Sequence, residues 1–145
     1  MDKGIYALLF SNPACSLVIG GLGKVRFRKG WHIYVGSARG PGGFARVKRH
    51  CRLALARDRA PKWHVDHLLV SPLFSLRSVV CGPTDEDLEC RLARALGNGG
   101  IPSFGCSDCG CPSHLFHRNT GPAREVTGAM ASLGLSPVST ILKKE

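Results

Sequence analysis

Five side chains of this 145-residue sequence carry groups that could act together on a phosphate ester. Tyr6 and Tyr34 are the two tyrosines of the chain and offer two hydroxyl groups. Arg46 offers a fixed fork of donors for phosphate oxygens, and His50 could serve as a base or as a hydrogen-bond partner of the phosphate. Glu89 is a hard oxygen ligand suited to Mg²⁺ or Mn²⁺. Phosphodiester cleavage needs such a set: an oriented water, a base, charge neutralisation and help for the leaving oxygen.

The pattern of apolar and turn residues places both tyrosines on strands. Short apolar or alternating runs bounded by Gly, Asn and Pro predict strands over 4–10, 15–19, 24–28, 31–35, 76–81 and 115–117. The segment 63–70 is apolar and ambiguous between a strand and a short helix. We therefore expect an α/β fold with a small mixed or antiparallel sheet flanked by helices.

Two helices should carry the charged candidates. A helix over 43–58 is predicted by an apolar stripe at a 3.6-residue period: Phe44, Val47, Cys51, Ala54 and Leu55. Arg46 and His50 then share one face, because they lie four residues apart.

A second helix is expected to open at Thr84, with Asp87 as its capping-box partner, and to end at Gly97. On that helix Glu89 would face the protein at the edge of the core, whereas Glu86 would point to solvent.

Several motifs together resemble those of the GIY-YIG nucleases. GIY at residues 4–6 is followed by YVGSA at 34–38 and by FARVKRH at 44–50, which is similar to the pattern of homing endonucleases. WHVDHLL at 63–69 and SDCGCPSHL at 107–115 are similar to the Uri-type endonucleases, also called DUF123. The resemblance covers roughly residues 3 to 118.

The resemblance implies a metal-dependent endonuclease that hydrolyses phosphodiester bonds, with DNA the favoured substrate and RNA left open. In the family the metal-binding glutamate lies on the second helix, which implies this role for Glu89, with Mg²⁺ or Mn²⁺ as the cofactor. Tyr6 would act as the base, which would require a lowered pKa, and Arg46 would stabilise the pentavalent phosphorus. Tyr34 and His50 would orient the phosphate. Since no separate DNA-reading domain is visible, a structure- or damage-directed substrate is favoured.

The chain departs from the family pattern in two places. The tyrosines are separated by 34 − 6 = 28 positions, which is longer than the common spacing, and a hairpin insertion there would leave the two motifs adjacent in the sheet. The Asn that many members carry after the metal-binding Glu has no clear counterpart. Asn98 lies in a Gly-rich loop, and neither Ser113 nor His114 can be assigned in its place.

The charge balance favours a polyanionic partner. Twenty Lys and Arg against ten Asp and Glu give a formal charge of +10, and each phosphate that a cation neutralises releases a counterion. Arg39, Lys48 and Arg49 are the expected nucleic-acid contacts. Two alternatives remain: a non-catalytic nucleic-acid-binding module with a zinc-bound Cys/His loop, and a nuclease-like fold that serves as a protein-interaction subunit.

A cluster of cysteines and histidines near residue 110 has the ligand types of a zinc site. Its members are Cys106, Cys109, Cys111, His114 and His117. Their spacing is too tight for all of them to bind one ion, so we expect a zinc-free loop packed against the tyrosine motifs, with a structural Zn²⁺ as the alternative.

The remaining cysteines and one histidine receive simpler interpretations. Cys15, Cys51, Cys81 and Cys90 are interpreted as small buried hydrophobes. His64 would share one side of a strand with Asp66, as a dyad or as a structural hydrogen bond.

The length suits one domain, with a nuclease-like part over 1–120 and a C-terminal helix and loose tail over 121–145, packed on or trailing it. No run of residues is apolar enough for a membrane helix, and the start resembles no signal peptide. A cytoplasmic protein is therefore expected, and the sequence leaves the oligomeric state open.

Overall fold

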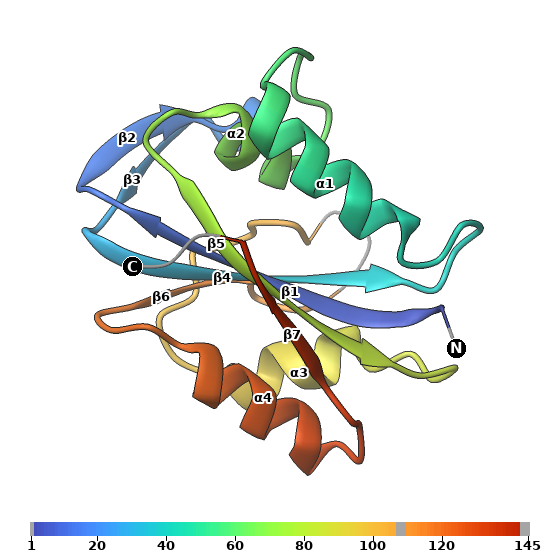
Figure 1. Ribbon diagram of the computed structural model, residues 1–145. Helices are drawn as coiled ribbons and strands as arrows, with labels where there is room; N and C mark the ends of the chain where they lie inside the picture. Colours follow the sequence, from blue (N-terminus) through green and yellow to red (C-terminus); the bar gives the residue numbers. More distant parts are fainter. Residues whose placement is uncertain (1, 107–109, 143–145) are drawn as a thin grey trace.

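The computed structural model describes residues 2–106 and 110–142, and within them an α/β fold built on one five-stranded antiparallel sheet (Figure 1). The strand order is β6-β4-β1-β5-β7. The strands span Gly4–Asn12 (β1), Gly30–Ala38 (β4), Ser75–Pro83 (β5), Leu115–Arg118 (β6) and Val138–Ile141 (β7). The expected α/β class is confirmed, and the sheet is antiparallel. The C-terminal segment was expected to be loose, but it continues the sheet, since β7 pairs with β5.

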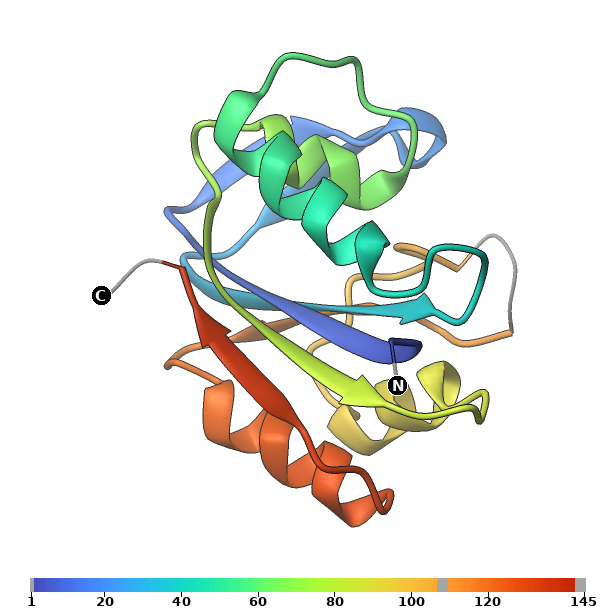
Figure 2. The ribbon, with the colours of Figure 1, turned by 45° about the vertical axis from the view of Figure 1, so that its right-hand side comes forward.

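The central strand β1 is apolar on both sides because the sheet is covered on both sides. Tyr6, Leu8 and Phe10 face one core, and Ile5 and Leu9 face the other. Helices α1 (Ala45–Ala56) and α2 (His64–Val70) cover the first face, whereas α3 (Glu89–Leu96) and α4 (Ala123–Ser132) cover the second (Figures 1 and 2).

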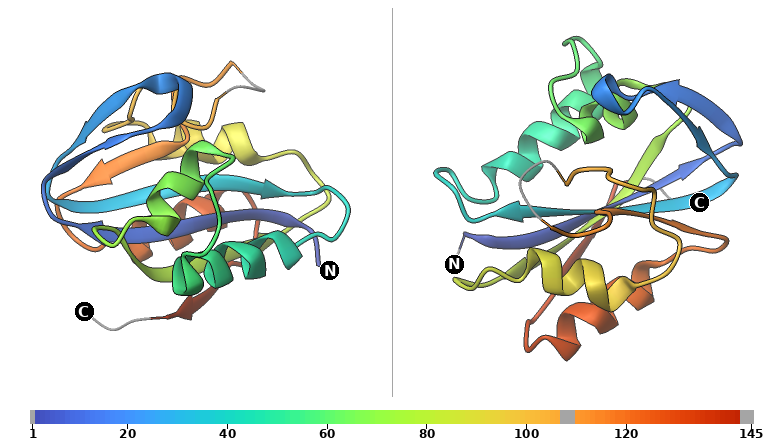
Figure 3. Two further views of the ribbon diagram at one scale, coloured as in Figure 1. Left: turned by 90° about the horizontal axis from the view of Figure 1, so that it is seen from above. Right: turned by 180° about the vertical axis from the view of Figure 1, so that it is seen from behind.

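The long connection between the tyrosine motifs forms the expected inserted hairpin. Strands β2 (Cys15–Val18) and β3 (Lys24–Phe27), joined by the short 3-10 helix η1 (Gly20–Leu22), make a two-stranded sheet of their own. The insertion leaves β1 and β4 paired along their whole length, with Tyr6 opposite Gly36 and Leu8 opposite Tyr34. The hairpin folds back over the first core, where the side chain of Phe27 is buried (Figure 3).

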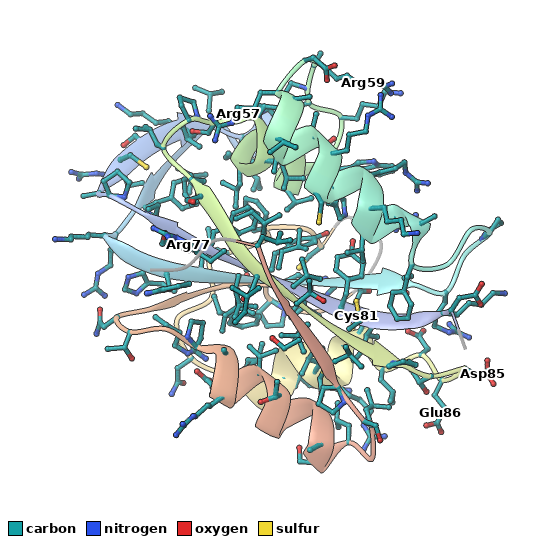
Figure 4. All side chains as sticks on the ribbon, viewed as in Figure 1. Arg57, Arg59, Arg77, Cys81, Asp85 and Glu86 are labelled. Atoms are coloured by element: carbon teal, nitrogen blue, oxygen red, sulfur yellow. The ribbon has the colours of Figure 1, made fainter. Side chains whose placement is uncertain are left out.

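Two helix expectations need correction. The apolar stripe of α1 ends before Leu55, which is 86% exposed. The second helix begins at Glu89 and not at Thr84, because the Thr84 hydroxyl accepts the backbone N–H of Glu86 at 3.0 Å and closes a turn. Glu86 therefore lies in an exposed loop and points away from the sheet edge (Figure 4). It is exposed as expected, but it is not part of the helix.

The ambiguous segment 63–70 is a helix, α2, because a carboxylate caps its first turn. Asp66 accepts the backbone N–H groups of Lys62 at 2.9 Å and Trp63 at 3.0 Å, which would otherwise lack partners at a helix start. His64 and Asp66 consequently do not form a dyad on one side of a strand. Among the described residues, no helix has both the length and the apolar character needed to cross a membrane.

Gly36 is expected to be irreplaceable even by alanine, because the Tyr6 ring occupies the space above it. A Cβ at Gly36 would lie 2.3 Å from Tyr6 Cζ and 2.4 Å from its hydroxyl oxygen. Gly36→Ala should lower the free energy of unfolding by roughly 1–3 kcal/mol or more, as overpacked cores do, measured by urea denaturation. The matched control is Gly128→Ala in α4, where a Cβ meets open space and should stabilise by up to about 1 kcal/mol. Equal stability of the two variants would contradict this packing.

Candidate functional site

The two tyrosines lie side by side on the α1 face of the sheet. Their ring centroids are 6.4 Å apart, and Tyr6 is almost fully buried whereas Tyr34 is half-buried. Residues of paired strands that face one another, or lie two apart on one strand, share a face of the sheet, and the register therefore places Tyr6 and Tyr34 together. Gly36 makes the arrangement possible, since its missing side chain leaves room for the Tyr6 ring.

His50 joins the tyrosines from α1. A hydrogen bond of 2.7 Å connects its Nε2 with the Tyr6 hydroxyl, and the two ring centroids are 5.5 Å apart. Burial is the main reason that the pKa of His50 is lowered to about 4. The Asp66 carboxylate opposes this shift, and the positive charges of Arg46 and Arg49 add smaller effects in the lowering direction. The imidazole is therefore neutral at pH 7 and can accept a proton.

Arg46 and Glu89 flank the tyrosines with opposite charges. The first turn of α1 is held near β1 because the Phe44 N–H donates to the Asp2 carbonyl at 2.8 Å, and Arg46 in that turn donates to the Ser37 carbonyl at 3.2 Å. Arg46 lowers the pKa of both tyrosines and Glu89 raises both. The charges of Arg46 and Glu89 thus both act on the two tyrosines, although Glu89 begins a helix on the opposite face of the sheet.

The direction of the Tyr6 pKa is opposite to the one that a base would require. Burial is the largest cause, and it raises the pKa of Tyr6 well above its usual value. The pKa of Tyr34 is raised for the same reason. Tyr6 is therefore a neutral phenol, and its hydrogen bond to His50 offers a path for its proton.

The three expected nucleic-acid contacts divide into two kinds. Arg39 is held by the protein itself: its Nε donates to the Asp85 carbonyl at 3.2 Å, and its guanidinium lies 3.8 Å from the Asp87 carboxylate. Lys48 and Arg49 are exposed on α1, where Arg49 lies one turn beyond Arg46 and Lys48 lies on another side of the helix. Farther along the chain, Arg57 and Arg59 project at the outer end of this helix (Figure 4).

The loop after α3 packs beside Tyr34, and His64 anchors it. The Gly105 N–H donates to His64 Nδ1 at 2.8 Å, and the His64 ring lies 5.4 Å from that of Phe104. A Cβ at Gly105 would come within 3.3 Å of both Tyr34 and His114. Seen from behind, this loop crosses the edge of the sheet between α1 and α3 (Figure 3). His64 therefore shapes the wall of the site through a structural hydrogen bond.

The Cys/His cluster predicted from the sequence is divided by the fold. Cys111 and His114 come together with Cys90, and one ligand atom from each lies within 4.8 Å of the other two. Cys106 instead donates to the Phe104 carbonyl at 3.3 Å, and His117 Nε2 lies 2.9 Å from the Lys29 carbonyl. Cys109 lies outside the described residues.

Cys90 is the residue that sequence reasoning missed, because it was interpreted as a small buried hydrophobe. It is distant in sequence from the other two residues, and no local spacing connects it with them. Its one informative signal is its position next to Glu89.

Among the described residues, none of the three candidates for the expected Asn position is an evident match. Ser113 is used within its own turn, where its hydroxyl donates to the Leu115 carbonyl and accepts the Leu115 N–H. The Asn98 carbonyl accepts from Arg118, which also binds both carboxylate oxygens of Glu125 at 2.8 Å and so ties β6 to α4. His114 is the residue beside the metal-ligand candidate, with its Nδ1 3.6 Å from the Glu89 carboxylate.

Comparison with known proteins identifies a family without an assigned activity. The family model described as a domain of unknown function, DUF123, matches residues 5–135. The search of curated proteins and the search of solved structures each return no significant match.

The lowered pKa of His50 predicts a loss of stability in acid. The pKa is near 4 when folded and about 6.5 when unfolded, so the unfolded chain binds more protons between these values and stability falls as the pH drops through that window. His50→Gln should make the decrease in unfolding free energy from pH 7 to pH 5 smaller by about 1–2 kcal/mol, measured by urea denaturation at both pH values. The pKa of His32 is also lowered, to about 3, and this residue acts equally in both proteins. Identical pH dependence of the variant and the wild type would argue against a buried, neutral His50.

Proposed function

The chain belongs to the DUF123 family, whose description names no function, and we propose that it is a metal-dependent endonuclease that hydrolyses phosphodiester bonds in DNA. The observation that carries the proposal is the meeting of Tyr6, Tyr34, Arg46, His50 and Glu89 at one end of the β1–β4 pair. A guanidinium, a neutral imidazole, two hydroxyls and a carboxylate in one site suit phosphoryl chemistry. The similarity of the motifs to GIY-YIG and Uri-type nucleases supports the same activity.

In the proposed reaction, the tyrosine and the histidine move the proton together. With the Nδ1–H tautomer, His50 Nε2 accepts the hydrogen bond of the Tyr6 hydroxyl over 2.7 Å. As the attacking water passes its proton to the Tyr6 oxygen, the phenolic proton passes to His50, so a free phenolate never has to form. Tyr6 thus acts as the base in spite of its raised pKa, because the neutral His50 accepts the phenolic proton at the same time.

Arg46 and Tyr34 would orient and neutralise the phosphate. The Arg46 side chain is exposed at the mouth of the site and can turn its guanidinium towards a non-bridging oxygen. The Tyr34 hydroxyl would donate to a second oxygen. Lys48 and Arg49 continue the positive surface along α1, where the backbone of a nucleic acid would lie.

Glu89 fits the role of a ligand for Mg²⁺ or Mn²⁺. Its side chain is 23% exposed and so partly open to solvent, and its carboxylate lies 3.6 Å from His114 Nδ1. Mg²⁺ is usually held by one or two carboxylates together with substrate phosphates and waters, so a single carboxylate is a sufficient protein donor. When bound, the ion would supply charge neutralisation on the phosphate and stabilise the leaving oxygen.

Two observations favour a second candidate function, a nucleic-acid-binding module without catalysis. The grouped Cys90, Cys111 and His114 could hold a structural ion, and the pKa of Tyr6 is raised rather than lowered. Such a module would bind DNA with a strong salt dependence and would cleave no substrate. A panel of branched, damaged, single-stranded and RNA substrates, incubated with Mg²⁺ or Mn²⁺, separates the two functions and identifies the preferred substrate.

Glu89→Gln should abolish cleavage because it removes the charge that the ion requires. We expect a loss of at least about 10²-fold in single-turnover rate, with DNA binding largely kept. The matched control is Glu86→Gln, a carboxylate of the neighbouring exposed loop, which should be nearly silent. Near wild-type cleavage by the Glu89 variant at saturating Mg²⁺ would remove this residue from the mechanism.

Arg46→Ala and Lys48→Ala should differ in kind. Loss of one charge contact that acts in the transition state costs about 10²-fold or more in rate, so Arg46→Ala should slow cleavage of bound DNA. Lys48→Ala should instead weaken binding to all sequences and reduce the salt dependence of affinity by about one unit. Small and equal effects of both changes would reduce Arg46 to one part of a general basic surface.

A further inference from the structure

We propose that Cys90, Cys111 and His114 bind a zinc ion, and that this ion holds Glu89 in position through the His114 ring. The zinc site itself stands apart from the nuclease activity, whereas its effect on Glu89 rests on that proposed function. The sequence favoured a zinc-free loop because the ligands within residues 106–117 lie too close together in the chain, but the fold adds Cys90 to Cys111 and His114.

The geometry of the three ligands suits a tetrahedral ion. One ligand atom from each residue lies within 4.8 Å of the other two, and Cys90 Sγ is 3.9 Å from His114 Nε2. Zn–S bonds of about 2.3 Å and Zn–N bonds of about 2.0 Å place neighbouring ligand atoms roughly 3.5–3.8 Å apart. Small rotations of the side chains would therefore bring the three ligand atoms to bonding distance from one zinc ion.

The ligand types select the metal. Two thiolates and an imidazole form a soft donor set that favours Zn²⁺, whereas Mg²⁺ and Mn²⁺ prefer carboxylates and waters. Glu89 and this cluster are thus neighbouring sites of different chemistry, and the two kinds of ion would not exchange places.

The backbone holds the His114 ligand rigidly in advance. The His114 N–H donates to the Phe104 carbonyl at 2.9 Å, and the His114 carbonyl accepts the Val35 N–H of β4 at 2.9 Å. His114 is 1% exposed. Cys90 lies in the first turn of α3, so the ion would join this helix to the loop that packs beside Tyr34.

The two nitrogens of His114 link the cluster to the candidate active site. Nε2 is directed at Cys90, while Nδ1 lies 3.6 Å from the Glu89 carboxylate. Histidines that bind zinc commonly donate their other N–H to a carboxylate, which fixes the ring and strengthens the ligand. A zinc ion on Nε2 would therefore place a proton on Nδ1 and hold the Glu89 carboxylate against it. Glu89 is not a ligand of this ion: its carboxylate and the zinc-bound His114 ring hold each other in position.

Elemental analysis of the full chain, purified without chelator, tests the site directly. We expect about one zinc per chain, lost in Cys90→Ser and in Cys111→Ser. Cys51→Ser is the matched control, because Cys51 is half-buried on α1 away from the cluster, and it should keep the zinc. A strong chelator should lower the melting temperature of the wild type, and added Zn²⁺, but not Mg²⁺, should restore it.

Two further measurements do not depend on how well the serine variants fold. Co²⁺ added to the chelated wild type should give a thiolate-to-metal absorption band. Glu89→Gln should keep the site but weaken zinc about 10–100-fold in competition with a chelator, because the carboxylate orients His114. An unchanged zinc affinity of this variant would overturn the link to Glu89.

Several results would overturn the zinc site itself: no zinc or another metal in the purified protein, a disulfide between Cys90 and Cys111, or full zinc content in Cys90→Ser. Cleavage assays separate this inference from the proposed function. Bound zinc without cleavage would support the zinc site and contradict the proposed nuclease activity. Cleavage by a wild-type protein that contains no zinc would support the nuclease activity and contradict the zinc site.

Discussion

The site depends on the close contact between the Tyr6 ring and the backbone of Gly36. Tyr6 comes from the central strand and would point straight into the first core, but its ring lies over the neighbouring strand, and only a residue without a side chain leaves that space. This position brings the hydroxyl to His50 and the ring beside Tyr34. A wider residue on β4 would displace the ring and separate the hydroxyl from the imidazole. The glycine thereby positions the Tyr6–His50 hydrogen bond, which contains none of its own atoms.

The sheet separates two cores, and the site lies where this separation ends. His50 and Arg46 reach the tyrosines from the α1 face, whereas Glu89 belongs to a helix on the other face. Beyond Tyr34, β4 pairs not with β6 but with the carbonyl of His114, so a loop closes this edge of the sheet. That loop carries His114 to the Glu89 carboxylate. The edge is thus where groups from both faces of the sheet come close to one another.

Local patterns predicted β1 to β6, the inserted hairpin and α1 because each depends on periodicity within a few residues. Strand β7 was missed, because it forms by pairing with β5, which is distant in the sequence. The predicted start of α3 was wrong, because the Thr84 hydroxyl closes a turn instead of capping a helix. The two local hydrogen bonds are of similar strength, so the sequence does not decide between them. The raised pKa of Tyr6 could not be predicted either, because it follows from burial by distant segments. Cys90 shows the same limit, as its neighbours Cys111 and His114 become neighbours only after the loop has folded.

The chain order of the sheet has a consequence for biosynthesis. Strand β1 leaves the ribosome before β4 and β5, the two strands that will flank it, and β5 ends only at Pro83. Until β4 has been made, an almost wholly apolar segment with strong strand propensity has both of its edges open, and one edge stays open until β5 is complete, which is the condition under which nascent chains associate wrongly. The inserted hairpin lengthens this interval, since it delays β4. Recombinant yield should therefore respond to slower synthesis and to chaperones that cover extended apolar segments.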